Sequence, residues 1–343
     1  MKEFSLVFMG FGNVGQALAR LLLRKQAALA DQYGISFKTV GIATGSHGRA
    51  IDAEGIPLAA ALECLERGVP LDTLSAIQPP TDGIDFIHAC PANILFENTP
   101  TRHTDGQPAI TYLRTALESG MHAITANKGP VVHAHQALVN LAAERGRRFL
   151  FESAVMDGAP IFSLFRGTLP ATDLRGFRGI LNSTTNLILE RMEQGETLED
   201  ATRYAQQIGI AETDPSADID GWDAAIKVAA LATVLMNLPT LPQEVKREGI
   251  RNLDRSQVAA ARRKNCRWKL VCEAHLENGR LNAGVAPRQV DSTSPLFSVC
   301  GTSSYIEFEL DSLPGLGILE SNPGPETTAY GLLADMINAA RGM

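Results

Sequence analysis

Several features that mark other classes of protein are missing from this 343-residue sequence. No apolar run approaches the ~20 residues that a membrane-spanning helix needs, so no membrane span is predicted. The formal net charge is −7, whereas non-specific nucleic-acid binding requires a basic surplus. The chain enters an apolar strand pattern directly after Met1 to Glu3, which leaves no room for a signal peptide.

Cysteine is scarce and is not arranged in the close pairs typical of metal sites. The five cysteines are Cys64, Cys90, Cys266, Cys272 and Cys300. Their odd number and wide spacing predict reduced thiols in a cytoplasmic protein. Internal repeats and low-complexity tracts are also missing. A hydrophobic content of 45% and a charged content of 20% are those of an ordinary globular protein, and the length predicts two domains.

A glycine-rich turn between a strand and a helix stands at the N-terminus. The apolar run Phe4–Met9 leads into Gly10-Phe11-Gly12-Asn13-Val14-Gly15, and a helix is predicted from Gln16 to about Arg24. This order is typical of a dinucleotide-binding unit, in which the helix N-terminus faces the pyrophosphate. The alternative is a glycine turn in an α/β protein that binds no nucleotide. The residues predicted to contact the cofactor here are Gly10, Phe11, Gly12, Asn13, Val14 and Gly15.

The end of the second predicted strand, Phe37–Ala43, bears on the choice of cofactor. An acidic residue there would bind the ribose 2′-hydroxyl of NAD. The sequence instead continues with Thr44, Gly45 and Ser46, and Arg49 follows. Thr44 and Arg49 are therefore predicted cofactor contacts, and NADP is favoured slightly over NAD. An arginine in a solvated loop is the alternative interpretation of Arg49.

Two further predicted strands end in candidate site residues, because ligands bind beyond the carboxyl ends of strands in open α/β sheets. Ile84–Ala89 is predicted as a strand that ends at Cys90, Pro91 and Ala92, which makes Cys90 and Pro91 candidate cofactor contacts. His122–Ala126 is predicted as a strand that leads into Lys128. Lys128 is the second charged candidate, and its alternative is a surface loop lysine.

The most informative stretch is an acidic loop followed by an apolar helix, Trp222–Met236. Only Asp223 and Lys227 carry charge in that helix, and their i, i+4 spacing places them on one face. A helix that is apolar on every side is usually buried, and buried charges must be paired. A structural ion pair is one interpretation. The other is a site for proton transfer on a cationic small substrate, with acids of the loop converging on the same spot. Those acids are Glu212, Asp214, Asp218 and Asp220.

The rest of the chain predicts a second domain that contains a sheet. Trp268–His275, Gly284–Pro287 and Tyr305–Leu310 have strand patterns, Gly315–Gly317 is predicted as a turn, and a helix closes the chain. The predicted fold class is α/β, with an N-terminal Rossmann-type dinucleotide-binding domain and an α+β domain. The predicted domains are residues 1–150 for the cofactor, 151–310 for substrate and dimerisation, and 311–343 as a segment that returns to the first domain.

The chain resembles homoserine dehydrogenase over nearly its whole length. The resemblance implies NAD(P)-dependent interconversion of L-homoserine and L-aspartate 4-semialdehyde in threonine, methionine and isoleucine biosynthesis, a homodimer, and the short form without a regulatory domain. A catalytically silent nucleotide-binding homologue and a dehydrogenase for a related small amino acid are the alternatives. The stretches that carry the resemblance are Gly10–Gly15, Thr125–Pro130, Glu152–Pro160, Gly179–Asn186, Glu212–Lys227 and the terminal turn with Thr328.

The resemblance also implies roles for individual residues. Lys227 matches the proton donor and Asp223 its partner, while Glu212 and Asp218 match residues of the amino-acid pocket. Lys128 matches a lysine between the nicotinamide ribose and the substrate, and Gly324 matches a glycine that contacts the cofactor. Members of the family often hold a monovalent cation on backbone carbonyls, which here would belong to Glu152, Val155, Asp157 and Ala159.

Three positions depart from the family pattern. Ser183 replaces a usual glycine, Asp157 replaces a small residue in the cation loop, and Asn322–Pro325 is stiffer than the usual glycine-rich turn. The first two departures affect loop geometry and cation binding, and the third affects cofactor affinity. None of them removes the predicted set of carboxylates and lysines.

Overall fold

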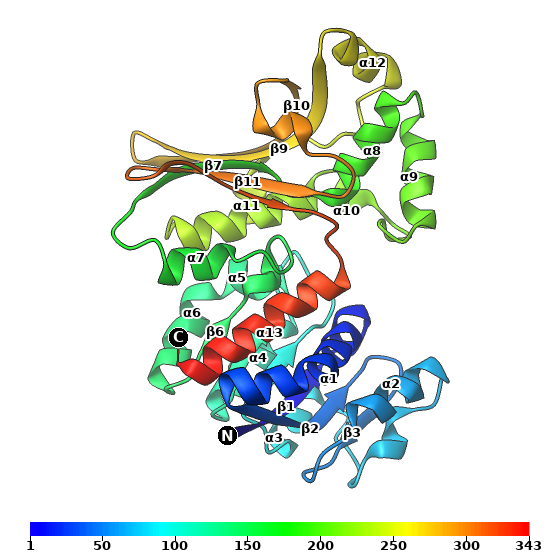
Figure 1. Cartoon of the computed structure of the whole chain (residues 1–343), viewed down its shortest axis with the longest axis vertical. Helices are drawn as coiled ribbons and strands as arrows, with labels where there is room; N and C mark the ends of the chain where they lie inside the picture. The colour runs from blue at the N-terminus through cyan, green and yellow to red at the C-terminus, as the bar shows by residue number, and fades with distance from the viewer. Residues whose placement is uncertain (343) are drawn as a thin grey trace. The chain divides into compact units, whose positions relative to one another are not determined.

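The computed structural model describes residues 1–342, and the chain forms two compact units. Unit 1 comprises Met1–Gly167 and the segment from Gly324 onward, and unit 2 comprises Thr168–Pro323 (Figure 1). The α/β class and the Rossmann-type first domain are confirmed. The division of the chain differs in position from the predicted boundaries at 150/151 and 310/311, because the loop after residue 150 is hydrogen-bonded to the C-terminal helix of the same unit: the Glu152 amide donates to the Asp335 carboxylate at 2.7 Å.

Unit 1 is built on a six-stranded sheet in the order β3-β2-β1-β4-β5-β6. All neighbouring strands are parallel except β2 and β3. The central strands are buried on both faces, as expected when helices cover a parallel sheet. The strands are β1 Lys2–Met9, β2 Ile35–Ala43, β3 Arg49–Ile51, β4 Ile94–Glu97, β5 His122–Thr125 and β6 Phe149–Leu150.

The helices of unit 1 pack on this sheet, and α1 lies beside the C-terminal helix α13 (Figure 1). Leu18 and Leu22 of α1 and Leu332 and Met336 of α13 are fully buried in one apolar core with strand β1. The helices are α1 Asn13–Tyr33, α2 Leu58–Glu66, η1 Leu71–Leu74, α3 Gly83–Ala89, α4 Ala109–Glu118, α5 Lys128–His133, α6 His135–Glu144, η2 Glu152–Ala154, α7 Ile161–Gly167 and α13 Pro325–Arg341.

The predicted strand at Ile84–Ala89 is wrong, because this segment is helix α3. The Asp82 carboxylate accepts hydrogen bonds from the Ile84 and Asp85 amides and caps the helix. Gly83, Phe86 and Ile87 are buried while Ile84 is exposed, which is a helical spacing. Short apolar runs do not distinguish helix from strand by periodicity alone. The strand is the next apolar run, β4.

Unit 2 contains a second six-stranded sheet, in the order β12-β11-β7-β9-β10-β8. Its pairs are antiparallel apart from β10 and β8. The predicted turn at Gly315–Gly317 is wrong, since these residues belong to β12 at the edge of the sheet, where glycine and proline are tolerated. The strands are β7 Leu174–Ile180, β8 Lys246–Arg247, β9 Cys266–Glu277, β10 Arg280–Asp291, β11 Ser304–Leu310 and β12 Pro314–Glu320.

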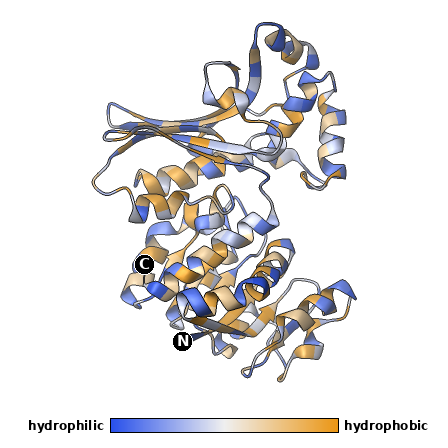
Figure 2. Ribbon diagram, viewed as in Figure 1, coloured by the Kyte–Doolittle hydropathy of each residue, from blue (hydrophilic) through white to orange (hydrophobic). Residues whose placement is uncertain are grey.

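The helices of unit 2 include the predicted apolar helix, which is α11. Figure 2 shows α11 in the hydrophobic colours along most of its length, and residues Ala224 to Ile226 and Val228 to Thr233 are buried. Within residues 1–342, no helix is both long and apolar enough to cross a membrane. The helices are α8 Ser183–Glu193, α9 Leu198–Gln207, α10 Ser216–Ile219, α11 Trp222–Leu235, η3 Pro242–Glu244, α12 Arg255–Arg263 and η4 Pro295–Ser298.

Candidate active site

A cavity of about 490 Å³ opens in unit 1 beyond the carboxyl ends of β1 and β2. This is the position at which an open parallel sheet binds its ligand. Gly10, Thr44 and Arg49, three of the predicted cofactor contacts, line this cavity. The other lining residues are Met9, Ala43, Gly45, Thr99, Pro100, Thr101, Arg102, Gln107, Pro108 and Tyr112.

The glycine turn at this cavity has the geometry that a dinucleotide requires. Gly10 has a φ of 94°, and a Cβ atom on it would overlap the backbone carbonyl of Asn98. A Cβ atom on Gly15 would lie 2.8 Å from the Gly10 carbonyl oxygen. Gly12 is the N-cap of α1, and a Cβ atom there would meet nothing within 4 Å. No side chain caps α1, so its first amides remain suited to a pyrophosphate, and the residues fit the cofactor.

Arg49 and Thr44 are held in defined positions beside the cavity. The Arg49 guanidinium donates to the carbonyls of Pro80 and Asp82 at 2.9 and 3.1 Å. The Thr44 hydroxyl donates to the Gly48 carbonyl at 2.9 Å and accepts from the His47 amide at 2.8 Å. Arg49 is therefore an ordered residue and not a solvated loop arginine.

Cys90 and Pro91 do not lie at the carboxyl end of a strand, so the reason for predicting them as cofactor contacts is wrong. They follow helix α3 and precede β4. Burial raises the pKa of the Cys90 thiol to about 12, which keeps it protonated and unreactive. The residues that follow the carboxyl end of β4 are Thr99 to Arg102, and these line the cavity.

A buried carboxylate that the sequence analysis missed organises this edge of the sheet. Glu97, the last residue of β4, accepts hydrogen bonds from the Thr99 amide at 2.8 Å and the Thr125 hydroxyl at 2.7 Å, and also from the Thr99 hydroxyl. Burial raises its pKa. The Asn127 side chain caps α5 at the Gly129 amide and so places half-buried Lys128 at the start of that helix. The position of Glu97, directly after the apolar run Ile94–Phe96, could have identified it in the sequence as an acid at the carboxyl end of a strand.

In unit 2, Lys227 and Asp223 form the predicted ion pair on α11. The Lys227 Nζ lies 2.8 Å from Asp223 Oδ2, and the two side chains are 16% and 17% exposed. The same Nζ donates to the Leu181 carbonyl at 2.6 Å. The pair is thus partly accessible and not sealed in the core.

Asp218 joins this pair through Asn182. The Asn182 amide donates to Asp218 Oδ1 at 2.6 Å and to Asp223 Oδ2 at 2.9 Å. Burial and the neighbouring charge of Asp223 raise the pKa of Asp218, while Asn182 and Lys227 oppose that rise. We call Asp218, Asp223 and Lys227 the Asp–Lys group. The sequence analysis named Asn182 only within the stretch Gly179–Asn186, and it gave no signal that its amide bridges two acids.

The other acids of the loop do not converge on the Asp–Lys group as expected. Asp220 is ion-paired with Arg251 at 2.8 Å. The Asp214 carboxylate accepts at 3.0 Å from the amide of Ser216, the first residue of the short helix α10. The side chain of Glu212 is exposed, and the carbonyl of this residue accepts from the Gln206 amide. Only Asp218 among the four joins the ion pair.

Comparison with known proteins decides the family. The homoserine dehydrogenase family model matches residues 160–337, and the model of the homoserine dehydrogenase NAD-binding domain matches residues 10–152. The chain belongs to the homoserine dehydrogenase family. It is accordingly an NAD(P)-dependent oxidoreductase that acts on a CH–OH group.

Relatives match nearly the full length of the chain. The NAD(+)-dependent homoserine dehydrogenase of Pseudomonas canavaninivorans is 33% identical over 98% of this chain and 96% of the relative. The homoserine dehydrogenase of Methanocaldococcus jannaschii is 34% identical over 97% of each chain. The crystal structure of a putative homoserine dehydrogenase from Archaeoglobus fulgidus superposes with a TM-score of 0.85 at 30% identity, and 98% of each chain is covered.

Two of the departures from the homoserine dehydrogenase pattern, Asp157 and the turn at Asn322–Pro325, are linked through the Thr327 hydroxyl. Asp157 has a φ of 46°, and its carboxylate accepts from the Thr327 hydroxyl at 3.0 Å. That hydroxyl oxygen accepts in turn from the Gly324 amide at 2.8 Å, at the N-cap of α13. The Glu152 carboxylate caps α7 through the Phe162 amide at 2.7 Å. The loop is therefore tied to both helices by its own acids.

Proposed function

We propose that this chain interconverts L-homoserine and L-aspartate 4-semialdehyde, with Lys227 as proton donor and Asp223 as its partner. The observation that carries the proposal is the partly exposed contact of 2.8 Å between Lys227 and Asp223, with Asp218 alongside. A bound nicotinamide supplies or accepts the hydride. The protein residues orient the amino acid and move the proton.

The charge of the Asp–Lys group supports an amino-acid substrate. Two carboxylates and one ammonium leave one excess negative charge, and the repulsion between Asp218 and Asp223 contributes to the raised pKa of Asp218. A substrate ammonium would compensate that charge. We propose that Asp218 binds the substrate ammonium together with Glu212, although the exposed Glu212 side chain does not join the Asp–Lys group in this structure. Lys128 is proposed to lie beside the nicotinamide ribose.

Lys227 acts in opposite protonation states in the two directions. In reduction, negative charge grows on the aldehyde oxygen, and the ammonium donates a proton to it. In oxidation, the amine must be neutral to accept the proton from the hydroxyl. We therefore expect oxidation of homoserine to accelerate at alkaline pH, and a flat pH profile for oxidation would contradict this role.

We propose that NADP is used at least as well as NAD. Arg49 and Arg102 line the cofactor cavity, and its lining within residues 1–342 includes no acidic side chain for a ribose 2′-hydroxyl. Arg49→Ala and Arg102→Ala should raise the KM for NADP more than the KM for NAD. Equal effects on both cofactors would show that neither arginine meets a 2′-phosphate.

The backbone carbonyls of Glu152, Val155, Asp157 and Ala159 are proposed to hold a monovalent cation. The proposal is supported by the left-handed backbone of Met156 and Asp157, which have φ angles of 55° and 46° within this loop. Activity measured with sodium, potassium or only a bulky organic cation tests the proposal. Identical activity in all three would reject it.

The proposed function is tested by mixing purified protein with L-homoserine and NADP and following the absorbance of the reduced cofactor. Turnover separates an active enzyme from a catalytically silent homologue, and substitution of related amino acids for homoserine tests the third alternative. A homodimer is proposed as the working state, and sedimentation equilibrium tests it. The cytoplasmic location stays a prediction.

A further inference from the structure

We propose that Asn182 is a positioning residue for this reaction: its amide holds Asp218 and Asp223 side by side as carboxylates next to Lys227. The inference rests on the proposed function of the Asp–Lys group. Asn182 is 3% exposed, and it lies between the last residue of β7 and the first residue of α8. Its two donors are directed at two different acids.

The orientation of the Asn182 amide is fixed by its neighbour Thr185. The Asn182 Oδ1 accepts from the Thr185 amide at 2.8 Å and from the Thr185 hydroxyl at 2.8 Å. The oxygen must therefore face Thr185, and both hydrogens of the nitrogen must face the carboxylates. One residue thus caps α8 and orients two acids at once.

The backbone at Asn182 holds the third member of the group. The preceding residue, Leu181, accepts the hydrogen bond from Lys227 through its carbonyl. This dipeptide follows β7, which is hydrogen-bonded to strands on both sides. Gly179 permits β7 to lie close to β11, since a Cβ atom on Gly179 would overlap the Tyr305 carbonyl. The dipeptide therefore links all three charged side chains to the sheet.

A neutral amide suits this position better than a charged donor or an acceptor. Two carboxylates in contact raise each other's pKa unless donors stabilise the charged forms. A second cation at residue 182 would neutralise the group and remove the excess charge that attracts a substrate ammonium. Another carboxylate would add repulsion. The amide supplies two donors and adds no charge. Asp218 and Asp223 therefore stay in fixed positions, and the group keeps its excess negative charge.

The groups that face Asp218 come from α11, from α8 and from the residue before α8. Asp223 and Lys227 lie on α11, Thr184 contributes a hydroxyl from α8, and Asn182 precedes α8. On β9, Cys272 lies near Lys227 and Asp223, and burial raises the pKa of this thiol to about 12, so it stays neutral. Cys272 therefore does not contribute to the titration of the group below pH 8.

The experiment compares Asn182→Asp with Asn186→Asp in the full-length enzyme. Both asparagines are buried at the start of α8, Asn182 as its N-cap and Asn186 in its first turn. The Asn186 side-chain amide donates to the Gly301 carbonyl and accepts from Lys269, and it does not contact the Asp–Lys group. The pH dependence of kcat/KM for homoserine reports the pKa values of the essential ionisable groups in the free enzyme. For Asn182→Asp we expect a loss of ~100-fold at pH 7 and an acid limb displaced upward by at least ~1 pH unit.

Asn186→Asp should lower the thermal stability. The acid limb, which is the low-pH side of the kcat/KM profile, should stay at its wild-type position. An unmoved limb in Asn182→Asp, with a loss no larger than that in Asn186→Asp, would overturn the positioning role and leave only a helix cap. If Asn182→Asp does not fold, Asn182→Ser, which keeps a favourable N-cap, is read in the same way.

Failure of the proposed function is recognised separately in the same assay. Lys227→Ala with wild-type turnover would reject the Asp–Lys group as the reacting site. An inactive Lys227→Ala together with an unmoved acid limb in Asn182→Asp would reject only the positioning role.

Discussion

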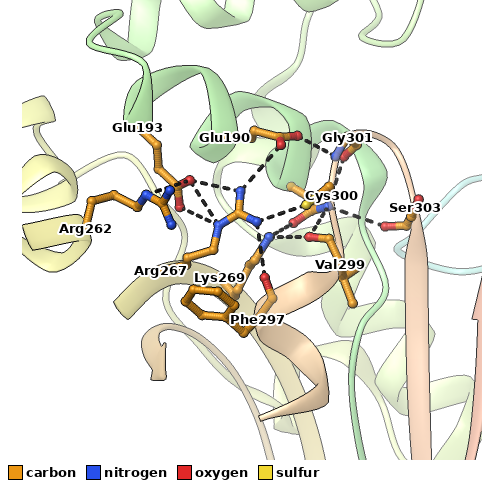
Figure 3. Close-up of polar contacts among 11 residues, drawn as sticks. Glu190, Glu193, Arg262, Arg267, Lys269, Phe297, Val299, Cys300, Gly301 and Ser303 are labelled. Carbon is orange, nitrogen blue, oxygen red and sulfur yellow. Dashed lines mark hydrogen bonds and ion pairs between the residues drawn. The ribbon is translucent and has the colours of Figure 1, made fainter. Parts of the chain in front are cut away.

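Unit 2 holds two clusters of charged side chains that both contact α8, and they differ in how the charges are matched. The second cluster, here the arginine cluster, consists of Glu190, Glu193, Arg262, Arg267 and Lys269 (Figure 3). Arg267 lies 2.9 Å from Glu193, and these side chains are 8% and 7% exposed. The Lys227–Asp223 pair is about twice as exposed as the Arg267–Glu193 pair, and its group has two acids and one lysine, whereas the arginine cluster has two acids and three basic side chains.

The arginine cluster has the properties of a structural network. Lys269 is 1% exposed and donates to the Asn186 side chain at 2.8 Å and to the Val299 carbonyl. Glu190 accepts from the Gly301 amide, which ties the loop before β11 to α8 (Figure 3). Removing one partner from a buried, hydrogen-bonded ion pair is strongly destabilising, because the remaining charge stays buried. Like charges left partly exposed around a neutral donor indicate a site that a ligand completes.

The largest expected effect contrasts the two lysines. Lys227→Ala should lose at least ~100-fold in turnover, the usual size of a general acid–base contribution, with little change in thermal stability. Lys269→Ala should lower the melting temperature and leave the turnover of the folded protein intact. Steady-state kinetics and calorimetry on both variants check the contrast, and equal turnover losses would abolish the distinction between the clusters.

Glu193→Gln should remove an ion pair from the arginine cluster and lower the stability of the protein, while the turnover of the folded enzyme stays unchanged. The change leaves Arg267 only the more distant Glu190 carboxylate, 3.4 Å away, and removing one partner of a buried ion pair costs about 3 to 5 kcal/mol of unfolding free energy. Denaturant unfolding measures this loss, with Glu199→Gln on the exposed face of α9 as the matched control. A loss no larger than that of the control would show that the pair is not structural.

The pH dependence of stability should sharpen the comparison further. Burial lowers the pKa of Lys269 from 10.5 to about 8, so between these values the unfolded chain binds more protons than the folded chain. The free energy of unfolding should therefore rise across this window, by about 3 kcal/mol if the full shift applies. Lys269→Met lacks this contribution, and unfolding of both proteins at pH 8 and pH 10 isolates it. A parallel pH profile in the variant would contradict the shift.

The smallest expected effect separates the acids of the loop. Asp220 pairs with Arg251, and these side chains are 34% and 59% exposed. Asp220→Asn should cost less than about 1 kcal/mol, as surface ion pairs do, and leave kcat unchanged. Asp218→Asn, by contrast, should raise the KM for homoserine. Steady-state kinetics of the two variants test whether Asp218, and not Asp220, contributes to substrate binding.

The sequence by itself determined the features that depend on neighbours along the chain. The glycine turn at Gly10–Gly15 and the pairing of Asp223 with Lys227 were predictable because both follow from local backbone geometry and helical spacing. Local pattern failed at Ile84–Ala89, where a short apolar run fits helix and strand equally and the Asp82 cap decided the outcome.

Which polar groups contact one another depends on the tertiary packing. The Asn182 amide reaches Asp218 across 36 positions of sequence, and Arg267 reaches Glu193 across 74. The structure also excluded Asp214 and Asp220 from the Asp–Lys group by giving them other partners. Hydrogen bonds act over about 3 Å, so contacts between distant segments depend on how the sheet and helices pack, and no local pattern of residues encodes them.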